Sequence, residues 1–135
     1  MGVKIVADHN NYLDLRVITL STGNAQTVFI GNAFSPTWSP SGGRIAFHIY
    51  SSAVVYGAIS TIAPDGSAYK VVVKARAGYG VSSPSWSPDS ANILYTQSFD
   101  NATSTYDVYR VSATGGSQVN LTPDLPGFPS SVAWR

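Results

Sequence analysis

The chain has 135 residues, of which 44% are hydrophobic and 12% aromatic, so it can bury a core and is not a disordered tail. Charged residues make up 11% and the formal net charge is +1, which argues against nucleic acid as a partner, because phosphate binding needs a surplus of Lys and Arg. Neither a membrane-spanning apolar stretch nor the apolar run of a signal peptide is present, and the sequence assigns no compartment.

The N-terminal quarter of the chain reads as three short strands. Residues rich in Val, Ile, Leu and Thr predict strands over 4–8 (KIVAD), 15–20 (LRVITL) and 25–30 (AQTVFI). The STGN segment at 21–24 is a turn signal, because Gly accepts positive φ without steric cost. No tryptophan comes before these strands.

A tryptophan motif, SPTWSP at 35–40, opens the second unit. A Ser-Pro turn follows it and leads into predicted strands over 45–50, 57–62 and 69–73. The tight turn at 64–66 (PDG) separates the last two, as expected for a hairpin.

The third unit repeats this order. SPSWSP at 83–88 begins 48 residues after SPTWSP, and strands are predicted over 93–99, 107–112 and 118–122. A third echo, SSVAW, places Trp134 another 48 residues beyond Trp86, which itself follows Trp38 by 48. Helical spacing is absent over any useful length.

A four-stranded antiparallel meander repeated at this period is typical of a β-propeller blade. We therefore expect an all-β chain with three such blades. Residues 1–34 would supply strands two to four of a first blade, with 4–8 aligned to 44–48; residues 35–82 and 83–130 would form the second and third blades, and 131–135 a closing inner strand.

The segments SPTWSPSGGRIAF and SPSWSPDSANILY resemble the repeat of TolB-like propellers, a WD40-like family. The resemblance covers essentially the whole chain, although the first unit is degenerate and the last Trp strand lacks the Pro-Asp-Gly tail of the family pattern. It implies that the Trp strand lies nearest the ring axis and that strands from both chain ends seal one blade, the closure called Velcro. It also allows a periplasmic or extracytoplasmic location.

Three blades are too few to close a ring, and an open arc exposes a strand edge that invites association. We hypothesise a head-to-tail homodimer that forms one six-bladed ring; a three-chain ring and a fragment cut from a longer propeller are the alternatives. The expected closing interface consists of Lys4, Ile5, Val6, Ala7, Ser131, Val132, Ala133 and Trp134.

The sequence offers little for catalysis. Without Cys or Glu, a metal site would need His9 and His48 together with aspartates such as Asp8 or Asp14, and their spacing fits no known ligand pattern. The GVSSP segment at 80–84 lacks the last Gly of a nucleophile elbow. We therefore predict no catalytic residues, no metal, no cofactor and no enzyme activity, and we interpret Trp38, Trp86 and Trp134 as wedges between blades.

The loops at one end of the expected propeller combine aromatic, Asn, Asp and Arg side chains, a composition common in recognition surfaces. The candidate binding face consists of Asn11, Tyr12, Tyr50, Tyr56, Arg76, Tyr79, Phe99, Asp100, Tyr106 and Phe128. We expect a non-catalytic scaffold that binds itself and a protein or peptide. The alternative is a fragment of a larger propeller protein, such as TolB or the gating propeller of a prolyl-oligopeptidase-like hydrolase, or a propeller-assembly piece without a ligand.

Overall fold

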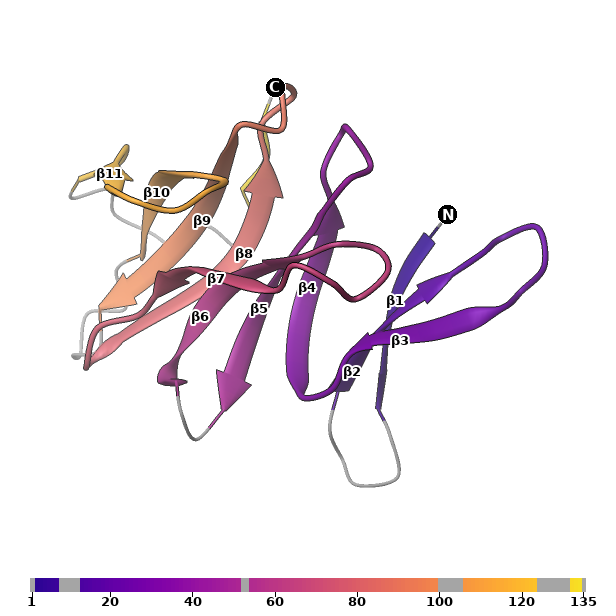
Figure 1. Ribbon diagram of the computed structural model, residues 1–135. Coiled ribbons are helices and arrows are strands. Elements are labelled where there is room, and N and C mark those ends of the chain that lie inside the picture. The colour runs from indigo at the N-terminus through magenta and orange to yellow at the C-terminus, as the bar shows by residue number, and fades with distance from the viewer. Residues whose placement is uncertain (1, 8–12, 52–53, 100–105, 124–131, 135) are drawn as a thin grey trace.

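The computed structural model describes residues 2–7, 13–51, 54–99, 106–123 and 132–134, with backbone alone for 2–7, 51, 54–56 and 99. The described residues form three separate antiparallel sheets (Figure 1). The all-β prediction is therefore confirmed. Among these residues there is no helix long and apolar enough to cross a membrane.

Each sheet is a meander in which strands adjacent in sequence pair with one another. The first contains β1 (Gly2–Ala7), β2 (Leu13–Ile18) and β3 (Ala25–Phe29). The second contains β4 (Asn32–Trp38), β5 (Ile45–Ser51), β6 (Val54–Ile62) and β7 (Lys70–Lys74). The third contains β8 (Tyr79–Trp86), β9 (Asn92–Phe99), β10 (Tyr106–Ser112) and β11 (Val119–Asn120).

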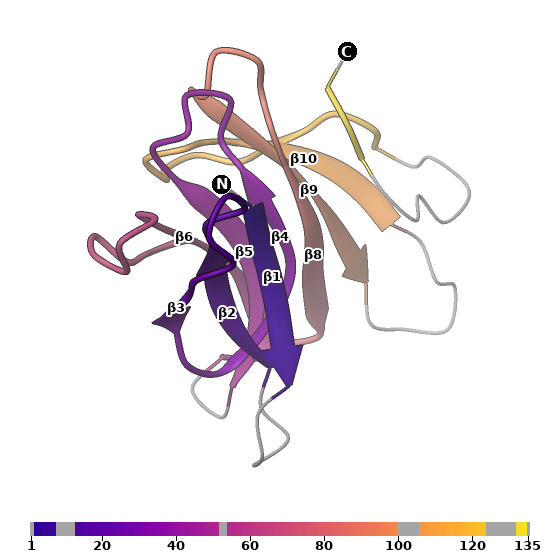
Figure 2. The ribbon, with the colours of Figure 1, turned by 90° about the vertical axis from the view of Figure 1, so that its right-hand side faces the viewer.

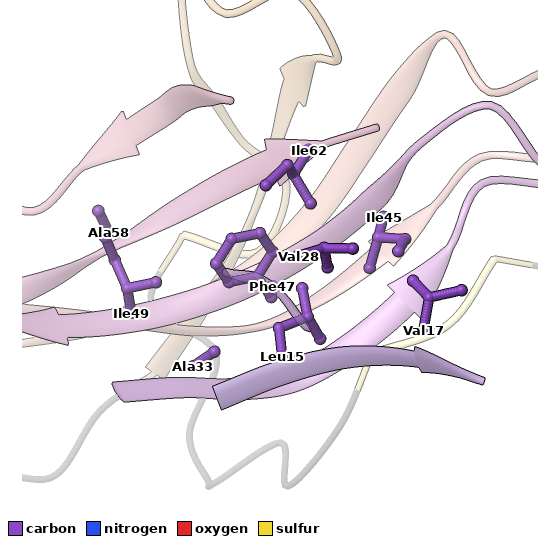
Figure 3. Packing of buried hydrophobic residues seen from close by; sticks show 9 residues of the cluster. All are labelled: Leu15, Val17, Val28, Ala33, Ile45, Phe47, Ile49, Ala58 and Ile62. Carbon is purple, nitrogen blue, oxygen red and sulfur yellow. The ribbon is translucent and has the colours of Figure 1, made fainter. Parts of the chain in front are cut away.

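The sheets pack face to face around two hydrophobic clusters. The first lies between the first and second sheets and surrounds Phe47, as Figure 3 shows. The second lies between the second and third sheets and includes Trp86 and Tyr95. Because successive side chains of a strand point to opposite faces, β5 contributes Phe47 to one cluster and its neighbour Ala46 to the other.

The repeated Ser-Pro pair marks a bulge in each tryptophan strand. Ser35 and Ser83 have φ values of 48° and 53°, and the pairing register shifts at this point in both β4 and β8. The following Pro cannot donate a ladder hydrogen bond, and a bulge accommodates this loss. Both strands therefore begin several residues before the motif, at Asn32 and Tyr79, because the bulge lies inside the strand.

The second Ser-Pro pair of each motif builds the turn after the tryptophan. The Ser39 hydroxyl accepts a hydrogen bond from the Arg44 backbone N–H at 3.0 Å, and the Ser87 hydroxyl accepts one from the Asn92 N–H at 2.9 Å. The two units thus close the connection between the first and second strands in the same way.

The first sheet lacks a tryptophan strand among the described residues, and β1 takes the place of a second strand. β1 and β2 both contact β4, just as β5 and β6 both contact β8. Figure 2 shows β1, β4 and β8 running side by side. The edge of β1 that faces away from β2 has no strand partner in the described part of the chain.

The pairing registers align β1 with the other second strands. Register shifts fall between Leu15 and Arg16 in β2 and between Ile59 and Ser60 in β6, so Arg16 corresponds to Ser60. Arg16 pairs with Lys4, and Ser60 pairs with Phe47. Lys4 therefore corresponds to Phe47 rather than to Arg44, and the sequence-based alignment of 4–8 with 44–48 is wrong by three residues.

The C-terminal segment is described at 132–134 and adopts no strand there. The strand expected over 118–122 is limited to Val119 and Asn120.

Candidate functional site

The tryptophan of the third sheet connects two sheets. Trp86 is 6% exposed, and its indole N–H donates a hydrogen bond to the Thr37 carbonyl of β4 at 3.1 Å. The equivalent indole nitrogens of Trp38 and Trp134 are buried and have no hydrogen-bond partner. The three tryptophans share a position in the repeat, but one of them alone has its acceptor.

Two further hydrogen bonds join the second sheet to the third. The Lys70 ammonium donates to the Thr114 carbonyl at 2.6 Å, and the Ser41 backbone N–H donates to the Ser90 hydroxyl at 3.1 Å. Arg44 is held on the second sheet, where its guanidinium donates to the Thr61 hydroxyl at 2.8 Å. A cavity of about 340 Å³ beside Trp86 is lined by Ser41, Arg44, Lys70, Ser90 and Thr114.

The expected closing interface is described in part. Lys4, Ile5, Val6 and Ala7 lie in β1, whose backbone alone is described. Val132, Ala133 and Trp134 are described and are not paired as a strand, and Ser131 lies outside the described residues. The structure of one chain does not bring the two halves of this interface together, so the interface stays a prediction.

The candidate binding face is also described in part. Tyr50 and Arg76 are exposed, and Tyr79 and Tyr106 are half-buried. Tyr56 and Phe99 lie in β6 and β9 with their backbone alone described. The remaining four, Asn11, Tyr12, Asp100 and Phe128, lie outside the described residues.

Tyr50 is only partly available to a partner, because its ring packs on neighbours. It is 42% exposed, and it meets the His48 ring edge-on with 4.6 Å between ring centroids. Phe34 packs against both rings. This cluster also lies against the third sheet, because a Cβ built at Gly80 would be 4.0 Å from the Tyr50 hydroxyl.

His48 lies inside β5. Its side chain is 6% exposed, and its Nε2 atom has no hydrogen-bond partner. Burial lowers the pKa of His48 to about 4, because the imidazolium would lose its hydration. The ring is therefore neutral at pH 7.

Arg76 borders a polar cavity of about 540 Å³ between the second and third sheets. Lys74 and Arg76 line one side of it, and Gln97, Tyr109 and Gln118 line the other. None of the described lining residues is acidic, so the cavity presents two positive charges together with amide and phenol groups. Such a lining suits an anionic ligand with hydrogen-bonding groups.

Two tyrosines stiffen the far wall of this cavity. Tyr95 and Tyr109 stack with 5.7 Å between ring centroids, and the Tyr95 hydroxyl donates to Gln118 Oε1 at 2.7 Å. Burial raises the pKa of Tyr109, the nearby charge of Asp107 raises it further, and Asn120 and Arg76 oppose the shift. Burial also raises the pKa of Tyr95, so both phenols are neutral at pH 7 and act as hydrogen-bonding groups.

The described residues contain no group of three metal-ligating side chains. Of the aspartates considered for a metal, Asp14 is buried, and its Oδ1 accepts a hydrogen bond from the Gly31 N–H at 3.2 Å; Asp8 and His9 lie outside the described residues. Asp14 therefore has a structural role in holding the connection between the first two sheets.

The sequence interpretation missed the basic cavities and the unsatisfied indoles. Arg44, Lys70 and Lys74 were not selected as candidate site residues, because the cavities that they line depend on how neighbouring sheets stack. The indole pattern had a signal in the repeat itself: three tryptophans at one position require three acceptors, and the first sheet supplies no strand to carry one.

The sequence matches no family model, and no curated protein matches it significantly. Solved structures do share its fold. A protein assigned as TolB from Agrobacterium tumefaciens superposes with a TM-score of 0.73 and 20% identity over 88% of this chain and 43% of its own. TolB from Acinetobacter baumannii gives a TM-score of 0.70 and 20% identity over 90% of this chain and 29% of its own.

The β-propeller domain of the Trilobed protease from Pyrococcus furiosus, described as having an open velcro topology, is also similar. It gives a TM-score of 0.66 and 19% identity over 90% of this chain and 39% of its own. The chain thus spans less than half the length of each of these proteins. Its fold is that of a TolB-like β-propeller.

Proposed function

We propose that this chain is a segment of a larger β-propeller, in which each sheet is one blade, and that it supplies blades and a binding surface rather than catalysis. The observation that carries the proposal is the coverage: 88% or more of the chain superposes on 43% or less of three propeller proteins. The unpaired edge of β1 supports it, because an exposed edge is a liability that a closed propeller removes.

The binding surface of the proposal is the basic cavity beside Arg76 and the end of the sheets near Tyr50. The cavity offers Lys74 and Arg76 without an acidic residue among its described lining. An acidic segment of a protein or peptide is the partner that this charge pattern favours. Protein binding without chemistry is also what the sequence suggests, because it offers no catalytic motif.

A second candidate is self-assembly, in which two copies of the chain close one six-bladed ring. The unsatisfied indoles of Trp38 and Trp134 favour it, since they lie on the first strand of the second sheet and in the C-terminal segment. In this case a second copy of the chain supplies the missing part of the ring.

A tandem fusion of two copies through a short flexible linker tests whether the chain is a propeller segment. We expect the fusion to behave as one compact particle of twice the 14.3 kDa chain mass in light scattering, with a single unfolding transition at a higher temperature than the unlinked chain at low concentration. A fusion that scatters as two separate arcs with an unchanged transition temperature would contradict the proposal.

A further inference from the structure

One hydrogen bond defines what the repeated tryptophan needs. Trp86 donates its indole N–H to the carbonyl of Thr37, which lies on the inner strand of the preceding sheet, one position before Trp38. A shift of one repeat, 48 residues, predicts that Trp134 should donate to the Ser85 carbonyl. By the same shift, Trp38 should donate to the residue that precedes the tryptophan on an inner strand beside β1.

That inner strand is absent from the described part of the first sheet, which ends at β1. The Trp38 indole nitrogen is buried without a partner. A buried donor without an acceptor costs free energy, and a strand edge without a neighbour leaves further donors and acceptors unpaired. Both defects lie on the same side of the molecule, because β1 contacts β4, the strand that carries Trp38.

The other end of the chain has the complementary defect. Residues 132–134 carry the repeat's third tryptophan, yet they form no strand, and the Trp134 indole nitrogen is buried without a partner. In the second and third units the equivalent segment is a strand because it pairs with β5 or β9. Residues 132–134 have no such neighbour within the described chain.

We propose that residues 132–134 of a second copy of this chain dock as a strand on the free edge of β1. The Ala133 carbonyl of the second copy then accepts the Trp38 indole hydrogen bond, as Thr37 does for Trp86. Paired in this way, the segment has the extended form in which its own Trp134 donates to Ser85. This docking gives both buried indole donors an acceptor and pairs the free edge of β1. The inference rests on the proposed propeller segment and adds that the neighbour of its open edge is a second copy of the chain.

The registers of the other sheets fix which residues face each other. Thr37 pairs with Ala46, and its equivalent Ser85 pairs with Leu94. The alignment of Lys4 with Phe47 places Val3 at the position of Ala46. Ala133 of the second copy should therefore lie opposite Val3, at the Cα separation of directly paired antiparallel residues, which a disulfide can bridge.

The chain contains no cysteine, so two introduced cysteines report on this pairing alone. The test is the V3C/A133C variant under mild oxidation, followed by a non-reducing gel and mass spectrometry. The matched control is K4C/A133C, because Lys4 is adjacent to Val3 and successive residues of a strand alternate between the two faces of a sheet. Mixing single variants V3C and A133C should yield the same cross-link between two chains, and A133C alone should not.

We expect V3C/A133C to form covalent dimers at least ten times more efficiently than K4C/A133C. A covalent trimer would equally support docking of another copy, with a larger ring. The inference is overturned if both pairs react alike, if V3C/A133C stays monomeric with free thiols, or if the disulfide forms within one chain. A tandem fusion that still closes would then leave the propeller segment intact and show that two copies meet in a register other than the one proposed.

Indole N–H exchange provides a measurement that needs no substitution on the edge. The three tryptophans give three ¹H–¹⁵N indole signals, which single Trp→Phe variants assign. Raising the protein concentration should slow hydrogen exchange of the Trp38 and Trp134 indoles by at least tenfold and leave Trp86 unchanged. Removal of residues 131–135 should abolish the effect on Trp38, and concentration-independent exchange of Trp38 in the intact chain would contradict the docking.

Discussion

The indole nitrogen of Trp86 lies 3.1 Å from the carbonyl oxygen of Thr37, and this hydrogen bond joins β8 to β4, the first strands of two neighbouring sheets. The same hydrogen bond, shifted by one repeat, predicts the acceptors of the other two tryptophans. Trp86 therefore packs between two sheets and also donates a hydrogen bond to the preceding sheet.

The W86F variant should therefore be less stable than W38F at a concentration where the chain is monomeric. Both lose the same part of the side chain, but W86F alone leaves the Thr37 carbonyl without its donor. We expect a difference of about 1 kcal/mol or more in the free energy of unfolding, measured by urea denaturation. Equal destabilisation of the two variants would mean that the hydrogen bond contributes nothing.

The G57A variant should be strongly destabilised. Gly57 has a φ of +90°, and a Cβ there would lie 2.9 Å from Nε2 of His48 and 3.3 Å from the Ile49 carbonyl. G115A is the matched control, because Gly115 has a φ of +85° but the nearest atom beyond its chain neighbours, the Val72 carbonyl oxygen, would be 3.6 Å away. Both variants should be destabilised by the left-handed backbone conformation. The free energy of unfolding of G57A should fall by roughly 1–3 kcal/mol more than that of G115A, because of overpacking.

Stability should depend on pH through His48. Its folded pKa, about 4, lies below the ordinary value of 6.5, so the unfolded chain takes up a proton that the folded chain refuses. The free energy of unfolding should therefore fall as pH decreases from 6.5 to about 4, by up to about 3 kcal/mol from this group.

The H48F variant checks this assignment, because it keeps an aromatic ring beside Phe34 and Tyr50 and removes the titrating group. It should be at least as stable as the parent chain at pH 7 and lose most of the pH dependence between 6.5 and 4. The H48F variant keeps His9, so any pH dependence that survives the substitution would come from His9 or from the carboxylates.

The turns after the two tryptophans share their Ser-Pro pair and differ at the position that follows it, which allows an exchange. Asp89 accepts hydrogen bonds from the Ser87 hydroxyl at 2.5 Å and from the Ala91 N–H at 2.9 Å, and the Ser87 bond, then the Ala91 bond, lower its pKa. The equivalent residue of the other turn is Ser41. We expect S41D to raise the melting temperature at neutral pH and D89S to lower it.

The pH dependence of this exchange has a defined sign. A carboxylate whose pKa is lowered on folding contributes stability above its ordinary range, and that contribution is lost as pH falls through the lowered value. The difference between D89S and the parent chain should therefore shrink in acid. A difference that stays constant down to strongly acidic pH would show that the carboxylate is not responsible.

An oligo-aspartate peptide provides a probe for the basic cavity. Its binding should weaken at least tenfold in the K74A/R76A double variant and should fall steeply with salt, because the proposed contact is electrostatic. R110A is the control, since it removes one exposed positive charge that does not line this cavity. Equal losses in both variants would indicate a diffuse charge effect rather than binding in the cavity.

The sequence predicted the strands well, because their signals are local. Eight of the expected segments coincide with strands β1–β3, β5–β7, β9 and β10 to within three residues at either end. The starts of the tryptophan strands were missed, since a Ser-Pro pair reads as a turn and the bulge that absorbs it depends on pairing with β5 or β9.

The candidate site was less accessible from sequence. Tyr50 and Arg76 were predicted as surface residues and are exposed, but the contact of Tyr50 with Phe34 and the cavity that Arg76 shares with Gln97 depend on how separate strands pack. The alignment of β1 also failed, because KIVAD and RIAFH share a hydrophobic pattern while register is decided by the bulge in β2.

The second sheet contributes side chains to both hydrophobic clusters, whereas the described residues of the first and third sheets each contribute to one. The chain is thus a short linear array of sheets in which each sheet is stabilised by packing against its neighbours. Local unfolding should begin at the outer units and reach the central unit last, so that proteolysis would leave a core around Phe47. A closed ring has no terminal units, and closure would convert this graded fraying into a single cooperative transition.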